Sequence, residues 1–231
     1  CLGLGVEEAY VKVQPDWFAK PPPEKVPEIP VFKLLDEVAE KYPDKTVLIF
    51  FDNKMTFREL KEFSDRFAAA LADLGVKKGD RVATMIPNSI NHVIVYFGIV
   101  KAGAISVPLN VMFKEEEVLV RLKDVEAKVI VVLDMFYPIV EKIKEEAGLE
   151  KIIVTSIDDF MPKFKRFLGR LLGKIPKYPV PKRPEIYRLT DLLKKYPPEP
   201  PKVDIDPKED VQIMIYTAGT TGGPPKAAML T

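Results

Sequence analysis

The regular alternation of strand-like and helix-like segments between residues 46 and 155 most constrains the fold of this chain. Apolar runs, such as the Val/Ile/Leu run within the predicted strand 128–133, are typical of buried strands, and the segments between them carry apolar residues at helical spacing. Strands that are apolar on both faces lie between two layers of helices, and strands that alternate with helices run parallel. The sequence therefore predicts an α/β fold with a mostly parallel sheet layered with helices.

The expected elements follow from this pattern. The strands are predicted at 46–51, 81–86, 104–109, 128–133 and 151–155, and the helices at 31–42, 57–74, 90–102, 114–126 and 138–147. The first strand is followed by a predicted turn at 52–54. The helix after Thr56 has the clearest signals. Thr56 and Glu59 form a capping box, and Gly75 is a C′ glycine that ends the helix.

A loop rich in glycine and threonine follows the apolar run 211–216. Glycines allow backbone N–H groups to close on an anion, threonine hydroxyls add donors, and Lys226 adds a positive charge. The loop 217–226 is therefore interpreted as a polyphosphate-binding loop, and the alternative is a solvent-exposed turn after an edge strand. It is not a Walker A loop, because Pro224 occupies the place of the second glycine.

Residues 217–226, with Met229-Leu230-Thr231 after them, resemble the phosphate-loop signature of the AMP-forming adenylating enzymes, which include the acyl-CoA synthetases. The family pattern is Thr-Ser-Gly-Thr-Thr-Gly-x-Pro-Lys-Gly, followed by an apolar residue and Met-Leu-Thr-His. This chain has Ala218 in place of the serine, Ala227 in place of the glycine, and one extra residue between Gly222 and Lys226. Shorter matches extend the resemblance over 31–231, at 42–45, 74–82, 87–89, 101–104 and 107–110.

The resemblance implies the N-terminal part of an ATP-dependent acid–CoA ligase of the fatty-acid type. Such an enzyme activates a carboxylic acid as acyl-AMP with ATP and Mg²⁺, and then transfers the acyl group to coenzyme A. The residues implied to bind the ATP phosphates are Thr217, Ala218, Gly219, Thr220, Thr221, Gly222, Gly223 and Lys226. The family's catalytic and metal-holding residues are implied downstream, so no catalytic residue is assigned and the 231 residues alone are expected to be inactive.

Other functions remain open. Within the superfamily, the acid can be small or aromatic, or the acceptor can be a carrier protein. From a different class, the chain can be a non-catalytic module that binds a nucleotide or a lipid. The expected organisation is an extended proline-rich arm at 1–30 and an incomplete adenylation domain at 31–231. That domain contains a basic, proline-rich insertion at 156–201 and the strand plus phosphate loop at 211–231.

The insertion contains a short amphipathic basic segment at 160–174. Its aromatic and basic side chains suit peripheral contact with an anionic membrane surface, where a fatty substrate is found. The alternative is a surface helix that packs on its own domain and has a solvated basic face.

Composition excludes several classes. A net charge of +1 argues against a nucleic-acid partner, and a single cysteine, Cys1, excludes intrachain disulfides. The longest apolar run, 93–100, is too short to span a bilayer, and the first residues lack a basic leader, so a cytoplasmic location is expected.

The only histidine, His92, is interpreted as structural, and Asp158-Asp159 as a helix cap. The oligomeric state is not predicted.

Overall fold

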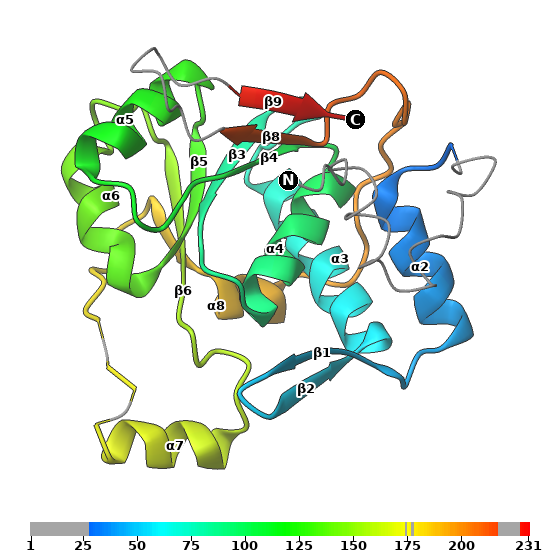
Figure 1. Cartoon of the computed structure of the whole chain (residues 1–231), viewed down its shortest axis with the longest axis horizontal. Coiled ribbons are helices and arrows are strands. Elements are labelled where there is room, and N and C mark those ends of the chain that lie inside the picture. The colour runs from blue at the N-terminus through cyan, green and yellow to red at the C-terminus, as the bar shows by residue number, and fades with distance from the viewer. Residues whose placement is uncertain (1–27, 174, 177, 217–226) are drawn as a thin grey trace, which may run out of the picture.

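A seven-stranded sheet forms the centre of the computed structural model, in which residues 28–173, 175–176, 178–216 and 227–231 are described (Figure 1). The strands are β3 (Arg81–Met85), β4 (Ile105–Pro108), β5 (Val129–Leu133), β6 (Lys151–Thr155), β7 (Ile186–Arg188), β8 (Ile213–Tyr216) and β9 (Ala227–Leu230). Their order is β7-β6-β5-β3-β4-β8-β9. All neighbouring strands run parallel except β8 and β9, so the predicted mostly parallel α/β fold is confirmed.

Helices cover both faces of this sheet, and the side chains of β5 pack into the cores on both sides. Val129 and Val131 belong to a core with α3 (Phe57–Asp73), α4 (Ile90–Lys101) and α8 (Leu189–Lys195). Ile130 and Val132 belong to the opposite core, with α5 (Glu115–Asp124) and α6 (Tyr137–Ile143). A 3₁₀ turn, η1 (Asp134–Phe136), joins β5 to α6. Because successive side chains of a strand point to opposite faces, an all-apolar strand serves two cores.

The helix predicted after Thr56 is confirmed as α3. The Thr56 Oγ1 accepts the Glu59 N–H at 3.3 Å, and the Glu59 carboxylate accepts the Thr56 N–H at 2.8 Å. After the helix, Gly75 has φ +86°, a conformation that glycine adopts without steric cost. The capping box and the glycine therefore fix both ends of α3 close to the predicted positions.

The first predicted strand lies outside the main sheet. Strand β1 (Thr46–Phe50) pairs with β2 (Asn53–Thr56) in a separate antiparallel hairpin. The turn residues are Phe51 and Asp52, with φ of 47° and 57°, and positive φ at both turn positions matches the twist of a two-residue hairpin. The predicted turn at 52–54 is one residue late. Helix α2 (Val31–Lys41) packs beside α3, and Leu35 joins a small core with Leu60.

The region 156–201 contains three elements. Helix α7 (Lys163–Leu171) stands away from the sheet in Figure 1, whereas β7 pairs parallel to β6 and α8 packs against α3. Residues 186–195 of this region thus form a strand followed by a helix. Helix α6 ends at Ile143, earlier than the predicted 147, and the chain then turns through Gly148 at φ +70°. None of the described helices has the length and apolar character needed to cross a bilayer.

Candidate functional site

The predicted phosphate loop starts where β8 ends. Strand β8 runs parallel to β4, with Ser106 opposite Ile213. Its last residue, Tyr216, therefore lies at the same edge of the sheet as the carboxyl ends of β3 to β6. Strand β9 returns antiparallel, with Tyr216 opposite Ala227. In open α/β sheets ligands bind outside the carboxyl ends of the strands. The strands that flank residues 217–226 therefore bring both ends of this segment to the edge where a ligand is expected.

The eight residues proposed to contact phosphate lie outside the described residues. They are Thr217, Ala218, Gly219, Thr220, Thr221, Gly222, Gly223 and Lys226. Their assignment stays a prediction, and the described structure defines only the two strands that hold the loop.

Helix α5 holds the last residue before the loop. The Tyr216 hydroxyl donates to the Asp124 carboxylate at 2.5 Å and lies 3.3 Å from the Arg121 carbonyl oxygen. Burial, together with this carboxylate, raises the pKa of the Tyr216 phenol, so the hydroxyl stays a neutral donor. The contact joins residues 92 positions apart. No local sequence pattern indicates this contact, so Asp124 and Arg121 are absent from the site predicted from the sequence.

The Arg121 guanidinium adds positive charge at the base of the loop. Its central carbon lies 3.9 Å from the Phe113 ring centroid and 5.3 Å from the Tyr216 ring centroid. One terminal nitrogen donates to the Glu117 carbonyl at 2.8 Å, and the buried Nε has no hydrogen-bond partner among the described residues. Cation–π contacts with two rings fix the side chain and leave its charge uncompensated by a carboxylate among those residues.

The carboxyl ends of β3, β5 and β6 are occupied by a buried polar network. The Asn91 amide donates to the Thr155 Oγ1 at 2.6 Å and to the Ser156 carbonyl at 3.0 Å. The Ser156 hydroxyl donates to Asp134 at 2.5 Å, and Asp159 accepts from the Thr155 hydroxyl and the Ser156 N–H, both at 2.8 Å. The chain leaves β3 and β5 toward opposite faces, and this divergence is the usual ligand crevice of such sheets. Here the protein's own side chains occupy it.

The interpretation of Asp158-Asp159 as a helix cap is wrong. Helix α7 begins after Pro162 without a side-chain cap. Asp158 instead accepts from the Arg170 Nε at 2.8 Å and lies 3.2 Å from the Arg166 Nε. Asp159 belongs to the polar network described above, where it accepts from the Thr155 hydroxyl and the Ser156 N–H.

His92 lies on the first turn of α4. Its backbone N–H donates to the Ser89 Oγ at 3.3 Å, so Ser89 caps the helix. Burial lowers the pKa of the imidazole, so it is neutral at physiological pH. Its Nδ1 has no hydrogen-bond partner among the described residues, and no carboxylate there activates it as a base.

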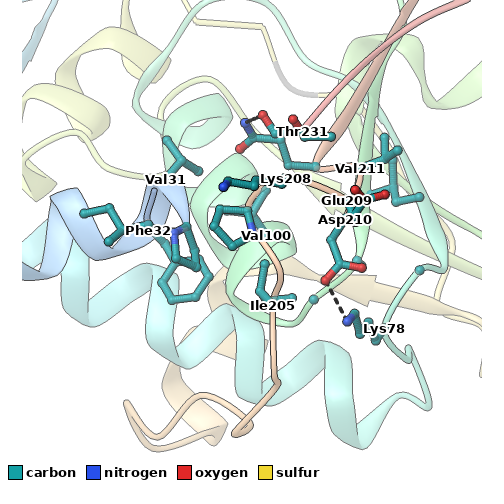
Figure 2. Close-up of a pocket in the computed structure, with 18 of the residues that line it drawn as sticks. Val31, Phe32, Lys78, Val100, Ile205, Lys208, Glu209, Asp210, Val211 and Thr231 are labelled. Atoms are coloured by element: carbon teal, nitrogen blue, oxygen red, sulfur yellow. Dashed lines mark hydrogen bonds and ion pairs between the residues drawn. The ribbon is translucent and has the colours of Figure 1, made fainter. Parts of the chain in front are cut away.

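A cavity of about 1370 Å³ lies at the opposite edge of the sheet (Figure 2). Its walls come from the start of α2, the end of α4 and the segments that precede β3, β4 and β8. Phe32, Val100 and Ile205 contribute apolar surface, and an ion pair of 2.6 Å joins Lys78 to Asp210 at one side. Because this is the amino edge of the sheet, the cavity is separate from the loop after Tyr216.

A family model describes this combination of sheet and loop. The model of the AMP-binding enzymes matches residues 35–231. The chain belongs to the AMP-binding enzyme family. A long-chain-fatty-acid–CoA ligase of Bacillus subtilis is 34% identical over 225 residues, which are 94% of this chain and 40% of that protein. A ligase of the same name from Escherichia coli O157:H7 is 34% identical over 206 residues, 86% of this chain and 36% of the relative.

Solved structures of this family share the fold. An anthranilate CoA ligase in complex with anthranoyl-AMP aligns with a TM-score of 0.73 and 27% identity, over 88% of this chain and 35% of its own. A long-chain-fatty-acid–CoA ligase of Archaeoglobus fulgidus aligns with a TM-score of 0.71 and 29% identity, over 91% of this chain and 38% of its own. The family member described here thus spans about two fifths of the length of the relatives it matches.

Proposed function

We propose that this chain is the N-terminal part of an ATP-dependent, AMP-forming acid–CoA ligase whose acid is a long-chain fatty acid. One observation carries the proposal: in a member of the AMP-binding family, a Gly/Thr-rich segment with one lysine joins β8 to β9 at the carboxyl edge of the sheet. The adenylation domain is proposed to extend over 31–231, with an arm at 1–30 and a basic insertion at 156–201.

The proposed reaction has two steps. A carboxylate oxygen attacks the α-phosphorus of ATP, the bond to the β-phosphate oxygen breaks, and acyl-AMP and pyrophosphate form. The thiol of coenzyme A then attacks the acyl carbon and displaces AMP. The hydroxyls of Thr220 and Thr221 and the ammonium of Lys226 would hold the β- and γ-phosphates and stabilise the charge on the leaving pyrophosphate. Mg²⁺, when bound, would neutralise part of the phosphate charge.

Pyrophosphate binding tests the loop directly. Isothermal titration of the 231-residue chain with Mg-pyrophosphate is expected to give saturable binding. The variant Lys226→Ala should weaken it about tenfold or more, since hydrogen bonds to charged groups contribute about 1.5–3 kcal/mol. Lys202→Ala is the matched control: it removes the same charge from an exposed side chain in the segment before β8. Equal affinities of both variants and the parent chain would contradict the assignment.

The 231 residues are expected to bind phosphates without forming acyl-AMP. The chain covers only 40% and 36% of two relatives, and the resemblance implies that the catalytic residues lie downstream. Hydroxylamine trapping with ATP and palmitate should therefore detect no hydroxamate above a blank without protein. Formation of palmitoyl hydroxamate by this chain would show that it carries the complete catalytic machinery.

An aromatic acid is the second candidate substrate. It is favoured by the fold match to an anthranilate CoA ligase bound to anthranoyl-AMP. Pyrophosphate release by the longest open reading frame that contains these residues, with palmitate and anthranilate in parallel, distinguishes the two acids. Peripheral membrane contact through residues 160–174 is a separate proposal, because it concerns α7 rather than the loop.

A further inference from the structure

Helix α7 exposes its apolar face to solvent. Phe164, Phe167 and Leu171 have 74%, 66% and 69% of their surface exposed, and Leu168 and Leu172 are also exposed. These residues follow the spacing i, i+3, i+4, i+7 and i+8, so they form one continuous stripe. A surface helix usually turns such a stripe toward its own core. Figure 1 shows α7 standing apart from the helices that cover the sheet.

The opposite face of α7 is attached to the protein by ion pairs. Arg166 and Arg170, four residues apart, both lie within 3.2 Å of the Asp158 carboxylate, whose side chain is buried. Arg166 also lies 3.8 Å from Asp159. The charged face is therefore turned inward and the apolar face outward. The ion pairs of the two arginines with Asp158 fix the orientation of α7, so the fold itself holds the apolar stripe toward solvent.

The segment around α7 carries charge of one sign. Residues 160–184 contain eight lysines and arginines and no aspartate or glutamate, although the whole chain has a net charge of only +1. The segment contains three arginines, Arg166, Arg170 and Arg183. Each of them forms an ion pair with a carboxylate outside the segment. Lys165 and Lys182 are exposed. Their charge beside an apolar stripe complements a surface that is both anionic and apolar underneath.

A second exposed apolar element lies at the same end of the molecule. Ile49 and Phe51 of the β1–β2 hairpin are largely exposed, and the Asn53 side chain donates to the Phe160 carbonyl oxygen just before α7. In Figure 1 the hairpin and α7 both form the lower border of the view. The apolar area of this end is thus larger than one helix.

We propose that α7 docks on an anionic lipid bilayer, with Phe164, Phe167 and Leu171 inserted below the headgroups and the neighbouring lysines at the phosphates. A second copy of this chain is a poorer occupant, because two such segments of like charge repel each other. A lipid surface has no such conflict. This inference goes beyond the proposed ligase activity and does not depend on it.

Vesicle co-sedimentation tests the proposal with the whole 231-residue chain. Binding is expected to vesicles of about 70% phosphatidylcholine and 30% phosphatidylglycerol, to be weak on pure phosphatidylcholine, and to fall as salt increases. The variant Phe164→Ser/Phe167→Ser/Leu171→Ser should lower the partition coefficient at least about tenfold, because the inserted apolar area is removed. The control variant Met112→Ser/Val120→Ser/Met135→Ser replaces three exposed apolar residues elsewhere and should bind as the parent does.

A fluorescence probe provides an independent measurement. A tryptophan introduced by Phe167→Trp should show a blue shift with the anionic vesicles, whereas one introduced by Val120→Trp should not, and Trp17 contributes the same background to both. Absence of vesicle binding, or equal binding of the parent and the α7 triple variant, would overturn the proposal. So would a dimer, measured by light scattering, that the triple variant loses while vesicles bind neither protein.

Discussion

Lys101 is a lysine whose ammonium group is buried between two carboxylates. Its side chain is 2% exposed, and its Nζ lies 2.5 Å from Asp65 and 2.6 Å from Asp36, which join α4 to α3 and α2. We expect Lys101→Met to lower the free energy of unfolding by about 3–5 kcal/mol, because the variant leaves the buried Asp65 carboxylate with Lys61 as its remaining partner. Urea denaturation measures the loss.

The matched control for Lys101 is Lys123, which pairs with Glu146 at 2.8 Å between exposed side chains. Lys123→Met should cost less than about 1 kcal/mol, since exposed ion pairs contribute little. If both variants lost the same stability, burial would not be the source of the Lys101 contribution.

Asp159 is expected to make stability depend on pH. Burial raises its pKa above the ordinary value of 3.8, against the opposing effect of the Ser156 N–H and the Thr155 hydroxyl. Between the ordinary pKa of the unfolded chain and the raised pKa of the folded chain, the folded state binds more protons than the unfolded state. The free energy of unfolding therefore falls as pH rises through the folded pKa of Asp159. Asp159→Asn has no such titration. The stability of the variant relative to the parent should therefore increase from about pH 4 upward and then reach a plateau.

Chemical denaturation at a series of pH values measures this difference, and any constant effect of the amide cancels. Glu150, an exposed carboxylate paired with Lys128, has a pKa lowered by that hydrogen bond, so Glu150→Gln should give a slope of the opposite sign. A pH-independent difference for Asp159→Asn would show that the carboxyl titrates alike in the folded and unfolded chain.

Single residues differ in how far their roles can be predicted. The roles of Thr56 and Glu59 were predictable because a capping box joins residues three positions apart. The contact of Tyr216 with Asp124 spans 92 positions and depends on the sheet order, so no sequence window contains it. The same holds for the pairing of Lys101 with a carboxylate 65 positions away in α2. Local chemistry is visible in the sequence, whereas long-range pairing of charges requires the fold.

At the scale of elements, α3 and α4 make close contact at Gly98. A Cβ at this position would lie 2.5 Å from the Phe67 Cδ1 and 2.9 Å from its Cβ. We expect Gly98→Ala to destabilise the protein by about 1–3 kcal/mol, because overpacking outweighs the gain of about 1 kcal/mol in helix propensity. Thermal denaturation measures the change.

A double-mutant cycle with Phe67→Leu tests the cause. Leucine lacks the ring that meets the new methyl group, so the cost of Gly98→Ala should be smaller in the Phe67→Leu background. Additive effects of the two substitutions would mean that the cost of Gly98→Ala arises elsewhere in the helix.

The elements themselves were largely predictable, and the exceptions have physical causes. Strands β3 to β6 are short, mostly apolar runs bounded by turns, and their predicted ends lie close to the observed ones. Strand β9 was not predicted. It contains four exposed residues and is defined by its pairing with β8 rather than by its own pattern. The orientation of the α7 stripe was left open between a membrane-facing surface and a face packed on the domain, because periodicity shows that a helix is amphipathic but not which face points to the core.

For the whole molecule, the fold class was predictable but the strand order was not. Alternation of strands and helices predicts a parallel sheet, whereas the order β7-β6-β5-β3-β4-β8-β9 depends on which connections cross. The strand order determines where a ligand can bind at the carboxyl edge. The crevice between β3 and β5 is filled by the polar network around Asn91 and Ser156, and β8 lies on the other side of β4. The phosphate loop at 217–226 stays a prediction from the sequence, whereas the contact of α5 with Tyr216, the residue before it, depends on the folded chain.

The sheet order also predicts how the isolated chain behaves in solution. Strand β9 has a strand partner on one side only among the described residues, and its sequence Ala-Ala-Met-Leu is exposed and uncharged. Exposed apolar edge strands pair with other chains, and an edge lysine prevents this. We expect Met229→Lys to lower self-association in a light-scattering concentration series. Met112→Lys adds the same charge at an exposed methionine outside any strand and should leave association unchanged. An equal effect of both variants would attribute the change to net charge instead of the β9 edge.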